Sequence, residues 1–227
     1  MAIMLSFWQS SWHFVDMTIL NPDHNCDLCP RLKAFIDDNR IKFPDKFNGP
    51  VPSFGPEEAE LLIVGLAPGL KGANFSGRPF TGDYAGDLLY GTLLRYGFAK
   101  GEFKARADDG LELINCRITN AVRCVPPENK PTGPEINECR PFLNSQFDHM
   151  PNLKVIFSLG LVSHNTVVKA SGDKLSAHKF GHNQTHTLQN GLTLVDSYHC
   201  SRYNTNTGRL TEAMFHDAFE TAISLLD

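Results

Sequence analysis

The stretch ELLIVGLAPG, residues 60–69, decides the fold of this chain. Its apolar first half is short and ends in Gly and Pro, which predicts a buried parallel strand that runs into a glycine-rich turn. Similar segments predict three further strands, at residues 111–122, 154–160 and 192–201. Helical patterns occupy the segments between and around these strands: 26–40, from near Tyr84, from near Pro134, 161–170 and 211–226. The alternation predicts a single α/β domain with a central four-stranded parallel sheet flanked by helices.

The carboxyl ends of the predicted strands are where a binding site is expected. In open α/β sheets, ligands bind in the crevice outside these strand ends. The loops that follow the four predicted strands begin after Gly65, Thr119, Leu159 and Tyr198. We therefore expect the functional side chains to come from these loops.

Length and charge restrict the class of protein. The 227 residues suffice for one α/β domain. A net charge of -4 argues against a protein that wraps nucleic acid with a wholly basic surface, but a DNA enzyme needs only a basic contact face. No apolar run approaches the ~18 residues of a membrane span. We expect a cytoplasmic monomer with no membrane contact.

The amino-terminal segment differs in character from the rest of the chain. Its apolar start lacks a basic region and is interrupted by His13 and Asp16, so it does not resemble a signal peptide. We interpret residues 1–23 as an extension and residues 24–227 as the folded domain. A true start at Met17 stays open as an alternative.

Four of the six cysteines have the pattern of a metal site. Cys26 and Cys29 have the spacing of a chelating turn, and Cys124 and Cys139 lie near the ends of one Pro-rich loop and helix start. Disulfides are not expected in a cytosolic chain. Four thiolates suit either a zinc ion or an iron–sulfur cluster, and the spacing does not choose between them. Buried, inert thiols are the remaining alternative.

Four motifs together resemble the uracil-DNA glycosylase superfamily: GLAPG (65–69), GANFSGRPFTGD (72–83), ITNAVRC (118–124) and YHCSRYNTNTGRLT (198–211). Within it, the motifs resemble family 5, or type B, which shares an iron–sulfur site with family 4. The resemblance covers roughly residues 24–222. It implies a base-excision repair glycosylase that hydrolyses the N-glycosidic bond of uracil, and of other deaminated bases such as hypoxanthine and xanthine, in DNA.

The resemblance also implies a cofactor and a base pocket. The cysteines at 26, 29, 124 and 139 match the four ligands of a 4Fe-4S cluster. Gly65, Ala67 and Gly69 match the motif whose backbone lines the base pocket, and Phe80 matches the aromatic side chain that stacks on the extruded base.

The remaining roles fall on three loops. Asp83 matches the acid of family 5, Asn120 the amide that faces the base edge, and His199 the histidine of a His-Pro-Ser motif. Ser201 and Arg202 lie in the loop that matches the minor-groove wedge. In the family pattern Pro follows the histidine, whereas this chain has Cys200, so the rigidity that proline would give this loop is absent.

Chemistry gives the same residues a function, and each has a structural alternative. Hydrolysis of the bond leaves positive charge on the sugar and negative charge on the base, which must first leave the stack. Phe80 is either a flat surface for the ring or a core residue, and Asn120 either binds the base edge or satisfies its own turn. His199 is either a donor to the departing base or structural. Asp83 is either the catalytic acid or a helix N-cap, and these two roles are compatible.

Two rival functions share parts of this pattern. One is an iron–sulfur or zinc-containing module of the same fold that binds DNA or transfers electrons without catalysis. Such a module needs no base-sized pocket, so the polar and aromatic residues at the strand ends speak against it. The other is a zinc-stabilised phosphohydrolase or nucleotide-binding protein, but GLAPG lacks the Gly-Lys-Ser/Thr ending of a phosphate loop.

Overall fold

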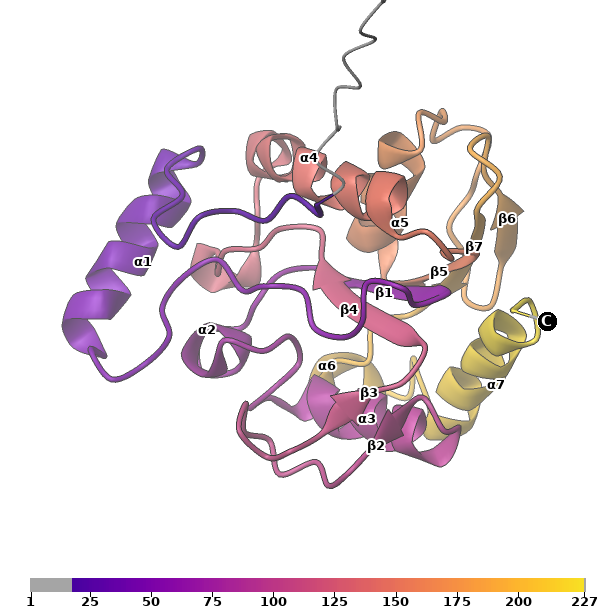
Figure 1. The fold of residues 1–227 in the computed structure, drawn as a ribbon, viewed down its shortest axis with the longest axis horizontal. Coiled ribbons are helices and arrows are strands. Elements are labelled where there is room, and N and C mark those ends of the chain that lie inside the picture. Colours follow the sequence, from indigo (N-terminus) through magenta and orange to yellow (C-terminus); the bar gives the residue numbers. More distant parts are fainter. Residues whose placement is uncertain (1–17, 227) are drawn as a thin grey trace, which may run out of the picture.

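A computed structural model describes residues 18–226, which form one α/β domain around a five-stranded sheet (Figure 1). The strand order is β4-β1-β5-β7-β6. Four strands are parallel and correspond to the four predicted ones: β1 (Leu61–Gly65), β4 (Cys116–Asn120), β5 (Val155–Leu159) and β7 (Thr193–Ser197).

The predicted number of strands was too small. Strand β6 (Thr185–Thr187) pairs antiparallel with β7 at one edge of the sheet. Its sequence Thr-His-Thr is polar and half exposed, so it carries no apolar signal of a strand. The predicted segment 111–122 also divides into β4 and a two-residue strand, β3 (Glu112–Leu113), which pairs with β2 (Ala99–Lys100) in a separate sheet. Asn115 lies between β3 and β4 with φ 50°, a left-handed conformation that interrupts an extended strand.

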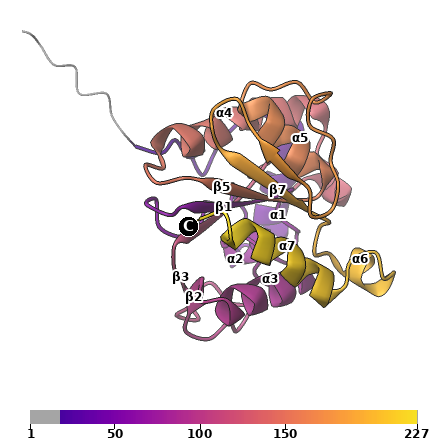
Figure 2. The ribbon, with the colours of Figure 1, turned by 90° about the vertical axis from the view of Figure 1, so that its right-hand side faces the viewer.

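Helices cover both faces of the central sheet (Figures 1 and 2). One face packs against α4 (Gly133–His149) and α5 (Leu161–Ala170), and the other against α3 (Tyr84–Arg95) and α7 (Glu212–Ile223). Alternate side chains of β1 point to opposite faces: Leu61 and Ile63 belong to the core under α3 and α7, and Leu62 and Val64 to the core under α4 and α5.

Three short helices and one longer helix lie outside these two layers. Helix α1 (Pro30–Lys42), predicted at residues 26–40, begins with proline at its first turn and packs beside the cysteines. Helix α2 (Ala73–Ser76) and the 3-10 helix η1 (Pro127–Asn129) lie in segments predicted as loops. Helix α6 (Arg202–Asn206) corrects the prediction of a purely polar loop after β7, because Ser201 caps it by accepting a hydrogen bond from the Asn204 amide.

The beginning of the described chain packs against the domain. Ile19 is buried in the core under α4 and α5, and the Leu20 amide donates to Ser145 Oγ at 2.7 Å. The boundary between residues 1–23 and 24–227 stays a prediction, and residues 1–17, with the alternative start at Met17, lie outside the described residues. Across residues 18–226, no helix combines the length and the apolar character that crossing a membrane requires.

Candidate active site

A cleft of about 920 Å³ opens at the carboxyl ends of β1, β5 and β7. The glycine-rich turn after β1, the start of α3, the start of α5 and the loop after β7 form its walls. Six of the residues predicted from the sequence line this cleft: Ala67, Gly69, Asp83, His199, Ser201 and Arg202. The cleft thus lies at the ends of three of the four predicted strands.

Gly65, Phe80 and Asn120 pack together beside this cleft and do not line it. A Cβ atom placed on Gly65 would lie 2.4 Å from Asn120 Oδ1 and 2.6 Å from Phe80 Cζ, so only glycine allows the amide and the ring to come this close. Both side chains are buried. The Phe80 ring belongs to the apolar core, and it also stacks on His199 with 6.0 Å between ring centroids.

The backbone holds Phe80 in an unusual conformation. Its φ of 52° lies in the left-handed region, which is disfavoured for a bulky side chain. The first turn of α3 closes over the Phe80 carbonyl, and a Cβ on Gly86 would lie 1.9 Å from that oxygen. Such strain persists only where the surroundings enforce it, and it is common at functional sites.

His199 lines the cleft and has a ring nitrogen without a hydrogen-bond partner among the described residues. It follows β7, and its carbonyl accepts a hydrogen bond from the Asn204 side chain at 2.8 Å. Its Nδ1 atom is buried and has no hydrogen-bond partner among the described residues. Burial lowers the pKa of His199 to about 4, because the charged imidazolium would lose its hydration. The imidazole is therefore neutral at physiological pH and can donate a hydrogen bond from one nitrogen only.

Asp83 occupies the N-cap position of α3, but its carboxylate forms no capping hydrogen bond. The Oδ1 atom is buried without a partner among residues 18–226. Burial raises the pKa of Asp83, and the nearby amides of Gly86 and Ala85 oppose this rise. The other oxygen lies against the glycine-rich turn, where a Cβ on Gly72 would come within 2.6 Å of it. The carboxylate thus lies at the cleft, close to the first amides of α3 although no capping hydrogen bond within the described residues has ideal geometry.

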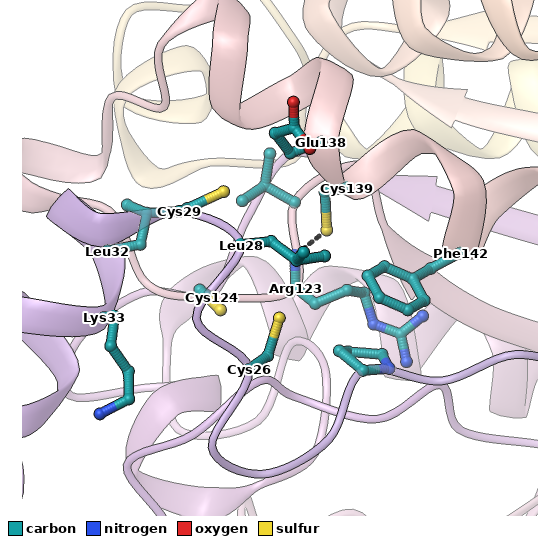
Figure 3. A pocket seen from close by; sticks show the side chains of 12 residues that line it. Cys26, Leu28, Cys29, Leu32, Lys33, Arg123, Cys124, Glu138, Cys139 and Phe142 are labelled. Atoms are coloured by element: carbon teal, nitrogen blue, oxygen red, sulfur yellow. Dashed lines mark hydrogen bonds between the residues drawn. The ribbon is translucent and has the colours of Figure 1, made fainter.

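The cysteines predicted as ligands meet at a second, smaller cavity. Cys26, Cys29, Cys124 and Cys139 all line it, together with apolar side chains of α1 and α4. Figure 3 shows their side chains around one common space, with the Arg123 amide donating to Cys139 Sγ at 3.3 Å. These cysteines come from two segments almost 100 residues apart, so the fold joins the turn before α1 to the loop before α4.

Comparison with known families decides the relationship of the chain. The sequence model described as "Uracil DNA glycosylase superfamily" matches residues 52–223. This chain belongs to the uracil-DNA glycosylase superfamily. The family resemblance of the four motifs is therefore confirmed.

Curated members of the superfamily match most of the chain. The "Type-5 uracil-DNA glycosylase" of Thermus thermophilus is 40% identical, over 84% of this chain and 89% of its own. The "Type-5 uracil-DNA glycosylase" of Mycobacterium tuberculosis is 38% identical, over 88% of this chain and 78% of its own. A "Type-4 uracil-DNA glycosylase" of Pyrobaculum aerophilum is 30% identical, over 79% and 77%.

Burial favours the neutral form of the thiols at the cysteine cavity of this glycosylase-superfamily chain. Burial raises the pKa of Cys29 and of Cys139 to about 11, and it also raises the pKa of Cys124. Repulsion between neighbouring thiolates adds to each shift. Because a metal ligand must be a thiolate, only a positively charged centre would make these groups release their protons.

A buried arginine lies directly behind the cysteines. Arg123 donates to Val51 O at 2.7 Å and to Thr119 Oγ1 at 2.8 Å, and burial lowers its pKa to about 10. Its side chain joins the cysteine loop to β4 and to the segment before β1.

Several residues that line the cleft escaped sequence-based prediction. Tyr198 lies beside His199 and could have been found by that adjacency, and its ring stacks on His182 and faces Arg209 at 4.7 Å. Lys71 and Phe180 carry no such signal. Asn129 reaches the cleft from the loop between Cys124 and Cys139, with φ 56°. A position this distant in sequence becomes visible only in the fold.

Proposed function

We propose that this protein is a uracil-DNA glycosylase that hydrolyses the N-glycosidic bond of uracil in DNA, the first step of base-excision repair. Membership of the superfamily and the names of its relatives support this function. The observation that carries it is a pair of buried polar atoms at the cleft, His199 Nδ1 and Asp83 Oδ1, that have no partner among the described residues. Buried polar groups are normally satisfied. Among the six buried side-chain atoms of the described residues without a partner, these two belong to residues that line the cleft, which supports a role toward a ligand.

The proposed mechanism begins with extrusion of the base from the duplex into the cleft. The Phe80 ring supplies a flat surface and the Asn120 amide a donor and an acceptor for the base edge. The Phe80 ring and the Asn120 side chain pack against Gly65. The edge of the bound base therefore has to reach the side of the turn after β1 on which Gly65 lies. Gly65, Ala67 and Gly69 keep that turn free of bulk.

Two groups act on the bond itself in this proposal. The neutral His199 imidazole donates a hydrogen bond to the departing base, where negative charge develops. Asp83 orients the attacking water and offsets positive charge on the sugar. Burial, which raises the pKa of Asp83, also strengthens the effect of its carboxylate on a nearby charge.

The rim of the cleft suits a DNA backbone. Arg202 and Arg209 face Tyr84 and Tyr198, at 5.3 and 4.7 Å from the ring centroids, and Lys71 adds a third cation. Such side chains contact phosphates and position the duplex. Tyr203, beside Arg202 on helix α6, is 72% exposed and is suited to enter the minor groove in the place of the extruded base.

The cluster belongs to the same proposal. Cys26, Cys29, Cys124 and Cys139 would hold a 4Fe-4S cluster that links two distant segments and keeps the loop carrying Asn129 in place. A tetrahedral zinc ion holds its thiolates less than about 4 Å apart. Among residues 18–226 the four thiols form no group of three within 4.8 Å, which favours a centre with several separate irons.

A glycosylase assay tests the activity. Protein purified under low oxygen is mixed in excess with duplexes that contain uracil, hypoxanthine or xanthine, and abasic sites are measured over time. We expect excision of uracil, and we extend the proposal to the other two bases because the cleft has room for a purine. Absence of excision by protein with its full iron content would favour the non-catalytic rival.

Iron analysis tests the cluster separately from activity. Cys124→Ser should lower the iron content of the purified protein, whereas Cys200→Ala should not, because Cys200 is buried beside Ala85 and outside the cysteine cavity. A colourless protein with one zinc per chain would replace the cluster by zinc. The monomeric state and the cytoplasmic location remain predictions.

A further inference from the structure

Helix α5 and strands β6 and β7 bring together a second set of metal-ligating side chains. His164, His186 and Asp196 each place one ligand atom within 4.8 Å of the other two. His164 Nδ1 lies 2.8 Å and His186 Nε2 3.1 Å from Asp196 Oδ2. His164 and Asp196 are almost fully buried, and the His186 side chain is 11% exposed at the edge of the sheet.

The hydrogen-bond partners of His164 determine which of its two ring nitrogens can bind a metal ion. Its Nε2 atom faces the carbonyl oxygen of His178 at 3.0 Å, so this nitrogen must carry a hydrogen. Its Nδ1 atom faces the carboxylate of Asp196. Nδ1 is therefore the nitrogen of His164 that can bind a metal ion beside Asp196.

The surroundings of the three side chains match those of ligated metals. A ligating histidine usually donates its other N–H to a carbonyl or carboxylate, and a ligating carboxylate is itself hydrogen-bonded. His164 has the first contact through His178 O, and Asp196 has the second, because Ser158 Oγ donates to its Oδ1 at 2.7 Å. Both contacts fix the orientation of the ligand atoms before any ion arrives.

We propose that His164, His186 and Asp196 bind one divalent transition-metal ion, and that zinc is the ion best suited to them. Two imidazoles and one carboxylate are a common zinc ligand set, whereas calcium and magnesium prefer oxygen ligands. The ion would replace the proton of His164 Nδ1 and reach the site past His186. It would fasten α5, β6 and β7 to one another, together with the segment between α5 and β6 that carries Phe180 to the cleft.

Zinc binding to the iron-loaded protein tests this site. The protein is purified under low oxygen, treated with a chelator, dialysed against zinc and analysed for zinc and iron per chain. We expect one zinc per chain in the parent and none in His186→Ala, with equal iron in both. His186 lies on a polar edge strand, so its replacement leaves the apolar core intact.

Two further variants keep the test decisive if His186→Ala folds poorly. Ser158→Ala retains all three ligands and removes only the donor to Asp196, so zinc affinity should fall by about 10-fold to 100-fold. His149→Gln removes a histidine that bonds Ser145 in α4, outside the proposed site, and should bind zinc as the parent does. Failure of the parent to bind zinc, or equal affinity in the parent and both site variants, would overturn the proposal.

Discussion

Asp109 and Asp83 both have buried carboxylate oxygens, but the surroundings of these oxygens are opposite in kind. The Asp109 carboxylate accepts hydrogen bonds from the two terminal guanidinium nitrogens of Arg78, at 2.7 and 2.8 Å. It also accepts hydrogen bonds from the backbone amides of Lys104 and Leu111. The hydrogen bond from Arg78 is the main reason why the pKa of Asp109 lies far below its usual range. Asp83 has a buried oxygen with no partner in the described chain, and burial raises its pKa.

We interpret the contrast as one between a carboxylate that stabilises the fold and one that, in the proposed function, acts on the substrate. The Arg78 guanidinium is enclosed by three aromatic rings, those of Phe54, Tyr90 and Phe103, at 5.2–5.7 Å. Both carboxylate oxygens of Asp109 accept hydrogen bonds from groups inside the protein. Asp83 lies at the cleft with a free acceptor, which costs stability and is expected where a side chain must act on a ligand.

The largest expected effect is on catalysis, at Asp83. Asp83→Asn keeps the size of the side chain and should lower the single-turnover rate of uracil excision by ~10²-fold to 10⁴-fold. The variant should unfold at the same or a slightly higher temperature, since an unpaired buried charge is removed. Asp87→Asn changes an exposed acid in the same helix and should retain the parent rate. A normal rate in Asp83→Asn would show that the Asp83 carboxylate has no part in catalysis.

The second effect concerns His199, whose Nδ1 atom is also buried without a hydrogen-bond partner among the described residues. Loss of one donor to a developing anion typically costs ~10²–10³ in rate, so His199→Ala should lose about that factor in single-turnover excision. Because its pKa is about 4, the imidazole stays neutral between pH 5 and 8. The excision rate should therefore show no inflection from this group in that range, and an inflection that disappears in His199→Ala would contradict a neutral donor.

The third effect concerns stability, at Asp109. Asp109→Asn leaves the buried Arg78 charge uncompensated, and breaking such a pair costs about 3 kcal/mol. The midpoint of denaturant-induced unfolding should fall accordingly, while the excision rate of the folded variant stays near the parent value. A large loss of rate with unchanged stability would reverse the assignment of the two aspartates.

The fourth effect is the pH dependence of stability, which should have opposite signs at the two positions. Asp109 has a lowered pKa in the folded state, so its stabilisation is complete above the unfolded pKa near 3.8 and is lost as pH falls below it. Asp83 has a raised pKa, so it lowers stability as pH rises through its folded-state value. Unfolding free energies measured from pH 3 to 7 should show Asp109→Asn below the parent and Asp83→Asn at or above it, with both differences shrinking at acid pH.

The sequence predicts a functional role for only one of these two aspartates, Asp83. Asp83 lies in a motif next to Phe80, and the four buried strands place that motif at a strand end. The sequence could not show whether its carboxylate caps α3 or stays free, because that depends on distances of a few tenths of an ångström. Asp109 and Arg78 are 31 residues apart in loops without periodic pattern, so nothing in the sequence pairs them.

Contacts between segments that are distant in sequence also explain why the sequence did not predict strand β6 or the second group of metal-ligating side chains. Strand β6 consists of polar residues whose pairing depends on β7, so its local pattern could not predict it. His164, His186 and Asp196 come together only through the order of α5, β6 and β7 in space. The four cysteines were easier to find, because a Cys-x-x-Cys turn is a local pattern.

The contact between Gly86 and Phe80 has a practical consequence for thermostabilisation. Helix α3 contains two glycines, and replacing a helical glycine by alanine usually raises stability by about 1 kcal/mol. A Cβ atom on Gly91 would have no atom within 4 Å from the rest of the described chain, outside its own stretch of helix, so alanine fits there. At Gly86 a methyl group would collide with the Phe80 carbonyl and displace the ring proposed to receive the base. An engineer who treats both glycines alike would make a sturdier protein with one substitution and damage its enzyme activity with the other.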